Sequence, residues 1–398
     1  MNAHSFVRRT SLTILMVVAV ANSATGEVLF KESFDDQPDW TSGMDINATD
    51  ANPAGKPDRV QSASTHVIPE GWYSIRQDPV WAPSTGYPDR HETIEILSSN
   101  ASKARGGTGK SFVSWRDSYD AGWNYWGSES MLVKYFPEGY DELYVEFWVR
   151  FGDNWTRKYV SGTPAAASKL FRISSWSGEG SEYQAFSGGE LGPIVLWDHT
   201  INSYGVRNAV AFRGGPHGDN YGFSTGSISG LPRQLVGSGD LNMNFTGDIR
   251  GMGVNGEDPK LPDRVNGGYI PLDPSVTISH DQIFGPGDSW TKMAFYVKMN
   301  SKPDATDGIF RQWINDEQIF NVTTIPWIRS SSSEDENAKW NLVAIGGNDF
   351  FQTYDNSERH EEWYSIDDVV IRNDIPESLK NGGVELAPPA PPAAVEVQ

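Results

Sequence analysis

The stretch "ELYVEFWVRF", residues 142–151, decides the fold. Alternate positions from residue 143 onward are all apolar, whereas the positions between them carry Glu142, Tyr144, Glu146, Trp148 and Arg150. A β-strand sends successive side chains to opposite faces, so this alternation predicts one face in a core and the other in water. We interpret the second face, with aromatic rings between charges, as a binding surface. An ordinary solvated face is the alternative.

A second stretch, "WTKMAFYVKMN" at residues 290–300, repeats this design. Met293, Phe295, Val297 and Met299 form an apolar face, and Lys292, Tyr296 and Lys298 form a polar one. The hairpin "DGIFRQWINDEQIFNV" at 307–322 follows, with a turn at 315–317. These patterns predict two antiparallel sheets that pack through their apolar faces.

The remaining chain reads as one all-β domain over residues 27–376. Short β-rich runs are separated by turn residues, and no amphipathic helix stands out. We predict strands at 92–97, 142–151, 168–173, 193–199, 206–213, 290–300, 308–314, 318–323, 341–346 and 364–372. Residues 214–288 are dense in turn residues and predict a long loop insertion that forms a lid or cleft wall. The Pro/Ala-rich tail, 377–398, is expected to be disordered.

The N-terminus has the pattern of a secretory signal. Arg8 and Arg9 precede an apolar run over residues 12–21 and a group of small residues. We expect residues 1–26 to be cleaved and the protein to be secreted, either extracellular or periplasmic. No later run is apolar enough to span a bilayer, so no membrane partner is expected. The chain contains no cysteine, so disulfides cannot hold it together.

Net charge and aromatic content limit the classes of function that the chain can have. The formal charge of −20 excludes a protein that binds nucleic acid through its phosphates. It also argues against a polyanionic substrate unless a local basic cleft overrides the global field. Fifteen tryptophans and fifteen tyrosines are many for so polar a chain, and sugar rings favour flat aromatic platforms. We expect a monomer whose partner is a polysaccharide.

Four C-terminal segments carry a resemblance to a known family: "WTKMAFYVKMN", "DGIFRQWINDEQIF", "WNLVAIGGNDFF" and "YSIDDVVIRND". Together they resemble the C-terminal half of concanavalin A-like β-jelly rolls, and most closely the secreted polysaccharide lyases of the glucuronan and alginate type. "LYVEFWVRF" with "SKLFRI" resembles the paired central strands of these lyases, and "RHETIEIL" resembles their Arg-x-Glu strand. The Gln-Ile-His and Tyr-Phe-Lys-Ala-Gly strands of the commonest alginate lyases are absent, as is the Glu-x-Asp-x-x-Glu motif of laminarinase-type glucanases.

The resemblance implies a concave sheet with a substrate groove, and cleavage of a uronic-acid polymer by β-elimination. That reaction needs a group that neutralises the uronate carboxylate, a base for the C5 proton and an acid for the leaving oxygen. The predicted catalytic residues are Arg90, His91, Arg150, His199 and Tyr144, with Arg150 as the partner of the carboxylate. The predicted substrate-binding residues are Glu146, Trp148, Lys169, Arg172 and Trp197.

Two other functions stay open at this stage. A non-catalytic, lectin-like sugar binder would explain the aromatic residues and the missing lyase strands. A glycoside hydrolase of the same fold would need two carboxyl groups across a cleft, and Glu142 and Glu146, about 13 Å apart on one strand, are too far from each other. A pair from different strands, such as Glu95 with Glu146, stays open.

A structural calcium ion is also predicted, because the acidic segments "FKESFDDQPDW" and "SIDDVV" pair in many jelly rolls. Its ligands would be Glu32, Asp35 and Asp367, with a plain acidic sheet edge as the alternative. No organic cofactor is expected.

Overall fold

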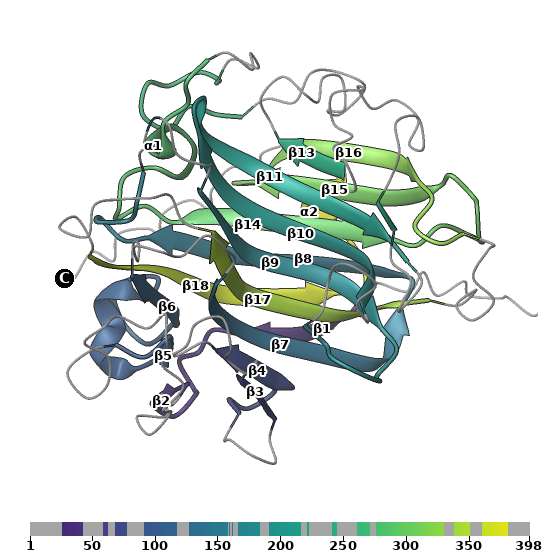
Figure 1. Ribbon diagram of the computed structural model, residues 1–398, viewed down its shortest axis with the longest axis horizontal. Helices are drawn as coiled ribbons and strands as arrows, with labels where there is room; N and C mark the ends of the chain where they lie inside the picture. The colour runs from purple at the N-terminus through teal and green to yellow at the C-terminus, as the bar shows by residue number, and fades with distance from the viewer. Residues whose placement is uncertain are drawn as a thin grey trace, which may run out of the picture.

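The computed structural model describes residues 26–42, 59–62, 68–77, 91–117, 127–157, 159, 161, 166–183, 191–215, 221–222, 241–244, 261–270, 276–329, 338–350 and 360–380. In these residues the chain forms two antiparallel β-sheets that pack face to face (Figure 1). None of the helices in this part is long and apolar enough to cross a membrane.

Sheet A has the strand order β16-β15-β14-β8-β18-β6-β5-β2, and β1 pairs with β18 beside this path. Its strands are β1 (Val28–Glu32), β2 (Trp40–Thr41), β5 (Ile94–Ile96), β6 (Phe112–Asp117), β8 (Glu142–Phe151), β14 (Thr291–Lys298), β15 (Gly308–Ile314), β16 (Glu317–Ile325) and β18 (Glu361–Arg372).

Sheet B has the order β12-β11-β10-β9-β17-β7-β4-β3, and β13 pairs with β11. Its strands are β3 (Arg59–Ser62), β4 (Ser74–Gln77), β7 (Gly127–Tyr140), β9 (Ala166–Trp176), β10 (Leu191–Asn202), β11 (Gly205–Gly214), β12 (Tyr221–Gly222), β13 (Leu241–Asn244) and β17 (Trp340–Phe350). In Figure 1, β9, β10 and β11 cross in front of β8 and β14 of sheet A.

The core between the sheets contains the apolar faces that the alternation predicted. Phe147 on β8 contacts Phe295 of its own sheet, with ring centroids 6.1 Å apart, and Phe171 of sheet B at 5.1 Å. The other alternate residues of β8 and β14 are buried in the same cluster. The predicted two-sheet jelly-roll sandwich is therefore confirmed, and each predicted strand coincides with an observed one.

The outer face of sheet A is less exposed to solvent than predicted. The short helix α2 (Glu377–Lys380) lies at the end of the chain described here, and its Leu379 packs with Ile375 against Tyr144 and Trp313. Tyr144 is 0% exposed as a result. The expected tail boundary at residue 377 thus divides an ordered segment, because residues 377–380 belong to the domain. Residues 381–398, and residues 1–25 of the predicted signal, lie outside the described residues.

The predicted loop insertion, 214–288, lies largely outside the described residues. Its described parts include β12, β13 and the helix α1 (His280–Phe284), which Ser279 begins with a capping box to Gln282. His280, Ile283 and Phe284 of α1 are buried, so this end of the insertion closes one end of the core.

Candidate functional site

Lys169 and Arg172 lie on the outer face of sheet B, which points away from the core. They are three residues apart on β9, and a regular strand would send them to opposite faces. A bulge places them together, because Trp197 of β10 pairs with Phe171 whereas the next residue, Asp198, pairs with Lys169. Bulges re-aim side chains in this way and are common beside active sites.

Two neighbouring strands add to this group. Arg76 on β4 forms an ion pair with Glu129 on β7, with 3.2 Å between Nη2 and Oε1. The guanidinium of Arg76 also lies 5.4 Å from the ring centroid of Tyr183, and Arg172 Nη1 donates to the Tyr183 carbonyl at 3.2 Å. We call Arg76, Glu129, Lys169, Arg172 and Asp198 the sheet-B cluster.

The electrostatics of the sheet-B cluster suit an acid–base reaction on an anionic ligand. Burial lowers the pKa of Lys169 to about 8, which Asp198 opposes and Arg172 reinforces. Burial also lowers the pKa of Arg172 to about 10, against the attraction of Glu129. An amine with such a pKa is partly neutral near neutral pH, so Lys169 can take up a proton while guanidinium groups hold a carboxylate.

Arg172 has a donor that the protein does not use. It is 4% exposed, and its buried Nε makes no hydrogen bond. Buried donors almost always have a partner, so an unused one calls for an explanation. The cluster contains three cations and two carboxylates when Lys169 is protonated, and the Glu182 carboxylate lies beside it, where it accepts a hydrogen bond from Ser74 Oγ at 2.9 Å. An anionic polymer would meet the guanidinium groups of Arg76 and Arg172 at this site.

His199 and Trp197, two predicted site residues, face the core and not the outer surface. His199 is 2% exposed and its Nε2 lies 3.1 Å from Nδ1 of His280. Burial, together with the positive charges of Arg116 and Arg157, lowers the pKa of His199 to about 3. The His199 ring packs against Phe151 and Phe284, so it lies between the two sheets and apart from the sheet-B cluster. Trp197 is 0% exposed and packs on Phe147 at 6.0 Å.

His91 and Arg150 lie on the outer face of sheet A, away from the sheet-B cluster. The His91 ring stacks on Trp115 at 3.5 Å and its Nδ1 lies 3.1 Å from the Glu95 carboxylate. Arg150 donates to two carbonyls, those of Gly287 at 2.9 Å and Ser102 at 2.8 Å. Arg150 thus joins loops to the sheet.

The predicted catalytic set therefore does not converge. Arg90 lies outside the described residues, and the other members occupy the core or sheet A. Of the predicted binding residues, Lys169 and Arg172 come together on sheet B, and Glu146 and Trp148 come together on sheet A.

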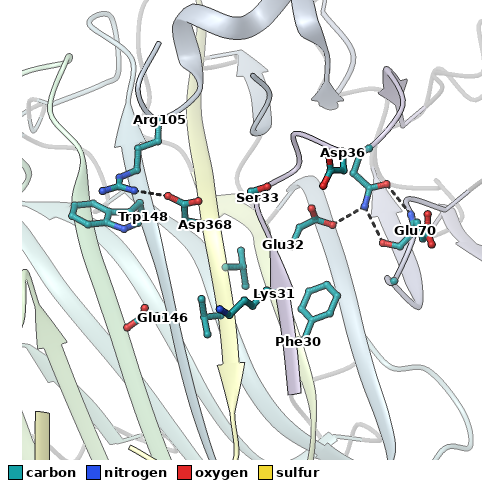
Figure 2. Close-up of a pocket in the computed structure, with 14 residues that line it drawn as sticks. Phe30, Lys31, Glu32, Ser33, Asp36, Glu70, Arg105, Glu146, Trp148 and Asp368 are labelled. Atoms are coloured by element: carbon teal, nitrogen blue, oxygen red, sulfur yellow. Dashed lines mark hydrogen bonds and ion pairs between the residues drawn. The ribbon is translucent and has the colours of Figure 1, made fainter. Parts of the chain in front are cut away.

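Glu146 and Trp148 line a pocket of about 790 Å³ on sheet A, beside β1 and β18 (Figure 2). The guanidinium of Arg105 lies 4.0 Å from the ring centroid of Trp148 and forms an ion pair with Asp368 at 2.5 Å. Figure 2 shows this group on one side of the pocket and Glu32 with Glu70 on the other.

The charges of this pocket do not suit an anionic polymer. Its acidic residues outnumber its basic ones by five to two. The acidic residues are Glu32, Asp36, Glu70, Glu146 and Asp368, and the basic residues are Lys31 and Arg105. A uronate chain would meet repulsion here, whereas the sheet-B cluster would attract it.

The three predicted calcium ligands do not form one ligand set. The Glu32 carboxylate accepts hydrogen bonds from Phe34 N at 2.6 Å, Gln37 Nε2 at 2.6 Å and Trp72 Nε1 at 3.2 Å. Burial raises the pKa of Asp367 to about 7, and the negative charge of Asp35 adds to this. Among the described residues no group of three or more His, Cys, Asp or Glu side chains could hold a metal ion. Calcium therefore stays a prediction.

Comparisons with known proteins give only distant similarities. No family model and no curated protein matches the chain. An alginate lyase variant in complex with an alginate tetrasaccharide is 13% identical, with a TM-score of 0.37, over 73% of this chain and 91% of that one. An alginate lyase from Chlorella virus is 12% identical, with a TM-score of 0.29, over 66% and 84%.

The β-agarase A from Zobellia galactanivorans is 9% identical, with a TM-score of 0.34, over 87% of this chain and 92% of that one. Identities and TM-scores this low carry no argument about activity.

Proposed function

We propose that this protein is a secreted polysaccharide lyase that cleaves a uronic-acid polymer at the sheet-B cluster. The observation that carries the proposal is the position of Lys169. The bulge of β9 puts this amine beside Arg172 on one face of the sheet, where burial lowers its pKa to about 8. A base near neutrality next to a carboxylate-binding guanidinium is what β-elimination requires.

Each residue of the cluster has a distinct role in this proposal. Arg172 binds the uronate carboxylate through its guanidinium and so acidifies the proton on C5. Glu129 holds Arg76 beside Tyr183. The positive charge of Arg76 there strengthens the attraction for the carboxylate. Asp198, opposite Lys169 in the strand pairing, keeps the amine close to the position from which it acts.

The proton and electron balance of the reaction is simple. Neutral Lys169 takes the proton from C5, the C–H electron pair forms the C4–C5 double bond, and the C4–O bond breaks. The glycosidic oxygen leaves with the electron pair of the C4–O bond and receives a proton from the Lys169 ammonium. The products are a new reducing end and a chain that begins with an unsaturated uronate.

The experiment is an assay on a panel of glucuronan, alginate and ulvan. Absorbance of the unsaturated uronate should rise together with reducing ends on at least one of the three polymers. Reducing ends without that chromophore would identify a glycoside hydrolase. Retarded migration in polymer-containing gels without any product would identify a sugar-binding protein, and either result would contradict the lyase.

A further inference from the structure

Next to the sheet-B cluster, three aromatic rings form a platform on the same outer face. Tyr73, Tyr135 and Trp176 contact one another, with ring centroids 5.2 Å apart for Tyr73 and Tyr135 and 4.9 Å for Tyr135 and Trp176. The third pair, Tyr73 and Trp176, is 5.9 Å apart. We call these three residues the aromatic platform.

The lower part of the platform is buried and its top is exposed. Trp176 is 4% exposed, and its indole Nε1 donates to the Glu179 carbonyl at 2.8 Å. Tyr73 lies above it and is 43% exposed, which makes it one of the few large exposed apolar side chains in the described residues. Core packing explains Trp176, but it does not explain a tyrosine ring that rests on two others and faces water.

The platform and the sheet-B cluster share a strand. Trp176, Ser174 and Arg172 alternate along β9, and the cross-strand partners of Arg172 and Ser174 belong to the apolar layer on the outer face of sheet B. Four residues of strand separate Arg172 from Trp176, a distance of about 13 Å, so a short run of sugar rings fits between them.

The strip has a cationic end at Arg172 and an aromatic end at Trp176. Ser174 lies between them but is 0% exposed, so it offers no group to a ligand. An anionic group and the apolar face of a ring are two features of a uronate oligosaccharide.

We infer that the aromatic platform is a distal subsite, where the ring of Tyr73 stacks on a sugar of the same uronate chain whose scissile unit lies at the sheet-B cluster. This inference rests on the proposed function for the identity of the chain. It adds a requirement for length, because a substrate too short to reach Tyr73 loses the contact.

The test compares Tyr73→Ala with Tyr73→Phe and with a matched control, Tyr204→Ala. Tyr204 is 49% exposed and lies in the turn between β10 and β11, at the far end of β10 from Trp176. KM and kcat are measured on the polymer and on a trisaccharide prepared from it. Aromatic contacts of ordinary strength predict that Tyr73→Ala raises the polymer KM roughly two- to tenfold. The trisaccharide KM should change less, and Tyr73→Phe should restore the polymer value.

Equal effects of Tyr73→Ala and Tyr204→Ala on the polymer KM would overturn the distal subsite, as would a Tyr73→Ala effect that is the same on both substrates. A wild-type protein that cleaves no polymer would contradict the proposed function alone. In that case migration in polymer-containing gels decides whether the aromatic platform binds the polymer. Retardation of the wild type that Tyr73→Ala abolishes supports the subsite, and retardation equal in both, or absent, contradicts it.

Discussion

Cleavage by this protein should follow the ionisation of Lys169. With a pKa of about 8, roughly one tenth of the amine is neutral at pH 7 and about nine tenths at pH 9. We therefore expect kcat/KM to rise about tenfold over that range and then level off. A lysine of ordinary pKa would give a rise of nearly a hundredfold, with no plateau by pH 9.

Two substitutions connect this profile to the structure. The carboxylate of Asp198 raises the pKa of Lys169, so Asp198→Asn should move the ascending limb to lower pH. Lys169→Arg has no neutral form in this range and should lose about 10²- to 10⁴-fold in rate. The control is Lys292→Arg on sheet A, where Lys292 forms ion pairs with Glu146 and Asp316, and its profile should match that of the wild type.

The assay is the initial rate of unsaturated-uronate absorbance at low substrate concentration, with circular dichroism to verify folding at each pH. An ascending limb that persists in Lys169→Arg would refute the reasoning, because the titrating group would lie elsewhere. A limb that does not move in Asp198→Asn would show that the two side chains are not coupled.

Three further predictions concern stability. Folded His199 has a pKa of about 3 while the unfolded residue titrates near 6.5, so the unfolded state binds more protons at acid pH. The free energy of unfolding from urea curves should therefore fall below about pH 6, by up to about 1.4 kcal/mol per pH unit, and by less in His199→Gln. The pKa of Asp367 is shifted in the opposite direction, to about 7. This carboxyl therefore stabilises the fold below about pH 4 and loses that effect as the pH rises through 7. Asp367→Asn should therefore raise the thermal midpoint at pH 8 with a chelator present, and added calcium should raise the thermal midpoint of the wild type alone. Arg150→Ala should lower the free energy of unfolding by about 1 to 3 kcal/mol through two lost hydrogen bonds and leave kcat/KM unchanged, as denaturant curves and rates will show.

The alternating strands made the sandwich predictable, but not what covers its outer faces. The apolar positions of β8 and β14 can face only a core, so their inward direction follows from the residues alone. Tyr144 lies on the opposite face and was expected in water. It is buried under Leu379 of α2, a helix of four residues that is too short to show a helical period in sequence.

The site was predictable in part. Lys169 and Arg172 were recognised as cations near the central strands, yet simple alternation would separate them, and only the bulge in β9 brings them together. The inward position of His199 was predictable, because this residue shares its strand face with Val195 and Trp197, both of which are core residues.

Arg76 and Glu129 were missed because the site is assembled across strands. Arg76 is on β4, a strand of four residues, and the sequence does not say which strand lies beside it. Glu129 follows the period of Met131 and Val133 on β7, so a carboxylate on an otherwise apolar face was the available signal.

The most direct test of the central claim compares two arginines, one on each sheet. Arg172→Gln changes the sheet-B cluster, and Arg105→Gln changes the acidic pocket of sheet A. On the polymer that the wild type cleaves, release of unsaturated uronate should fall about 10²- to 10³-fold in Arg172→Gln, because it loses the group that stabilises the developing charge. In Arg105→Gln the rate should stay within about twofold of the wild type, as for other substitutions away from a reacting centre. Normal cleavage by a folded Arg172→Gln, or loss of cleavage in Arg105→Gln alone, would contradict the placement of the active site on sheet B.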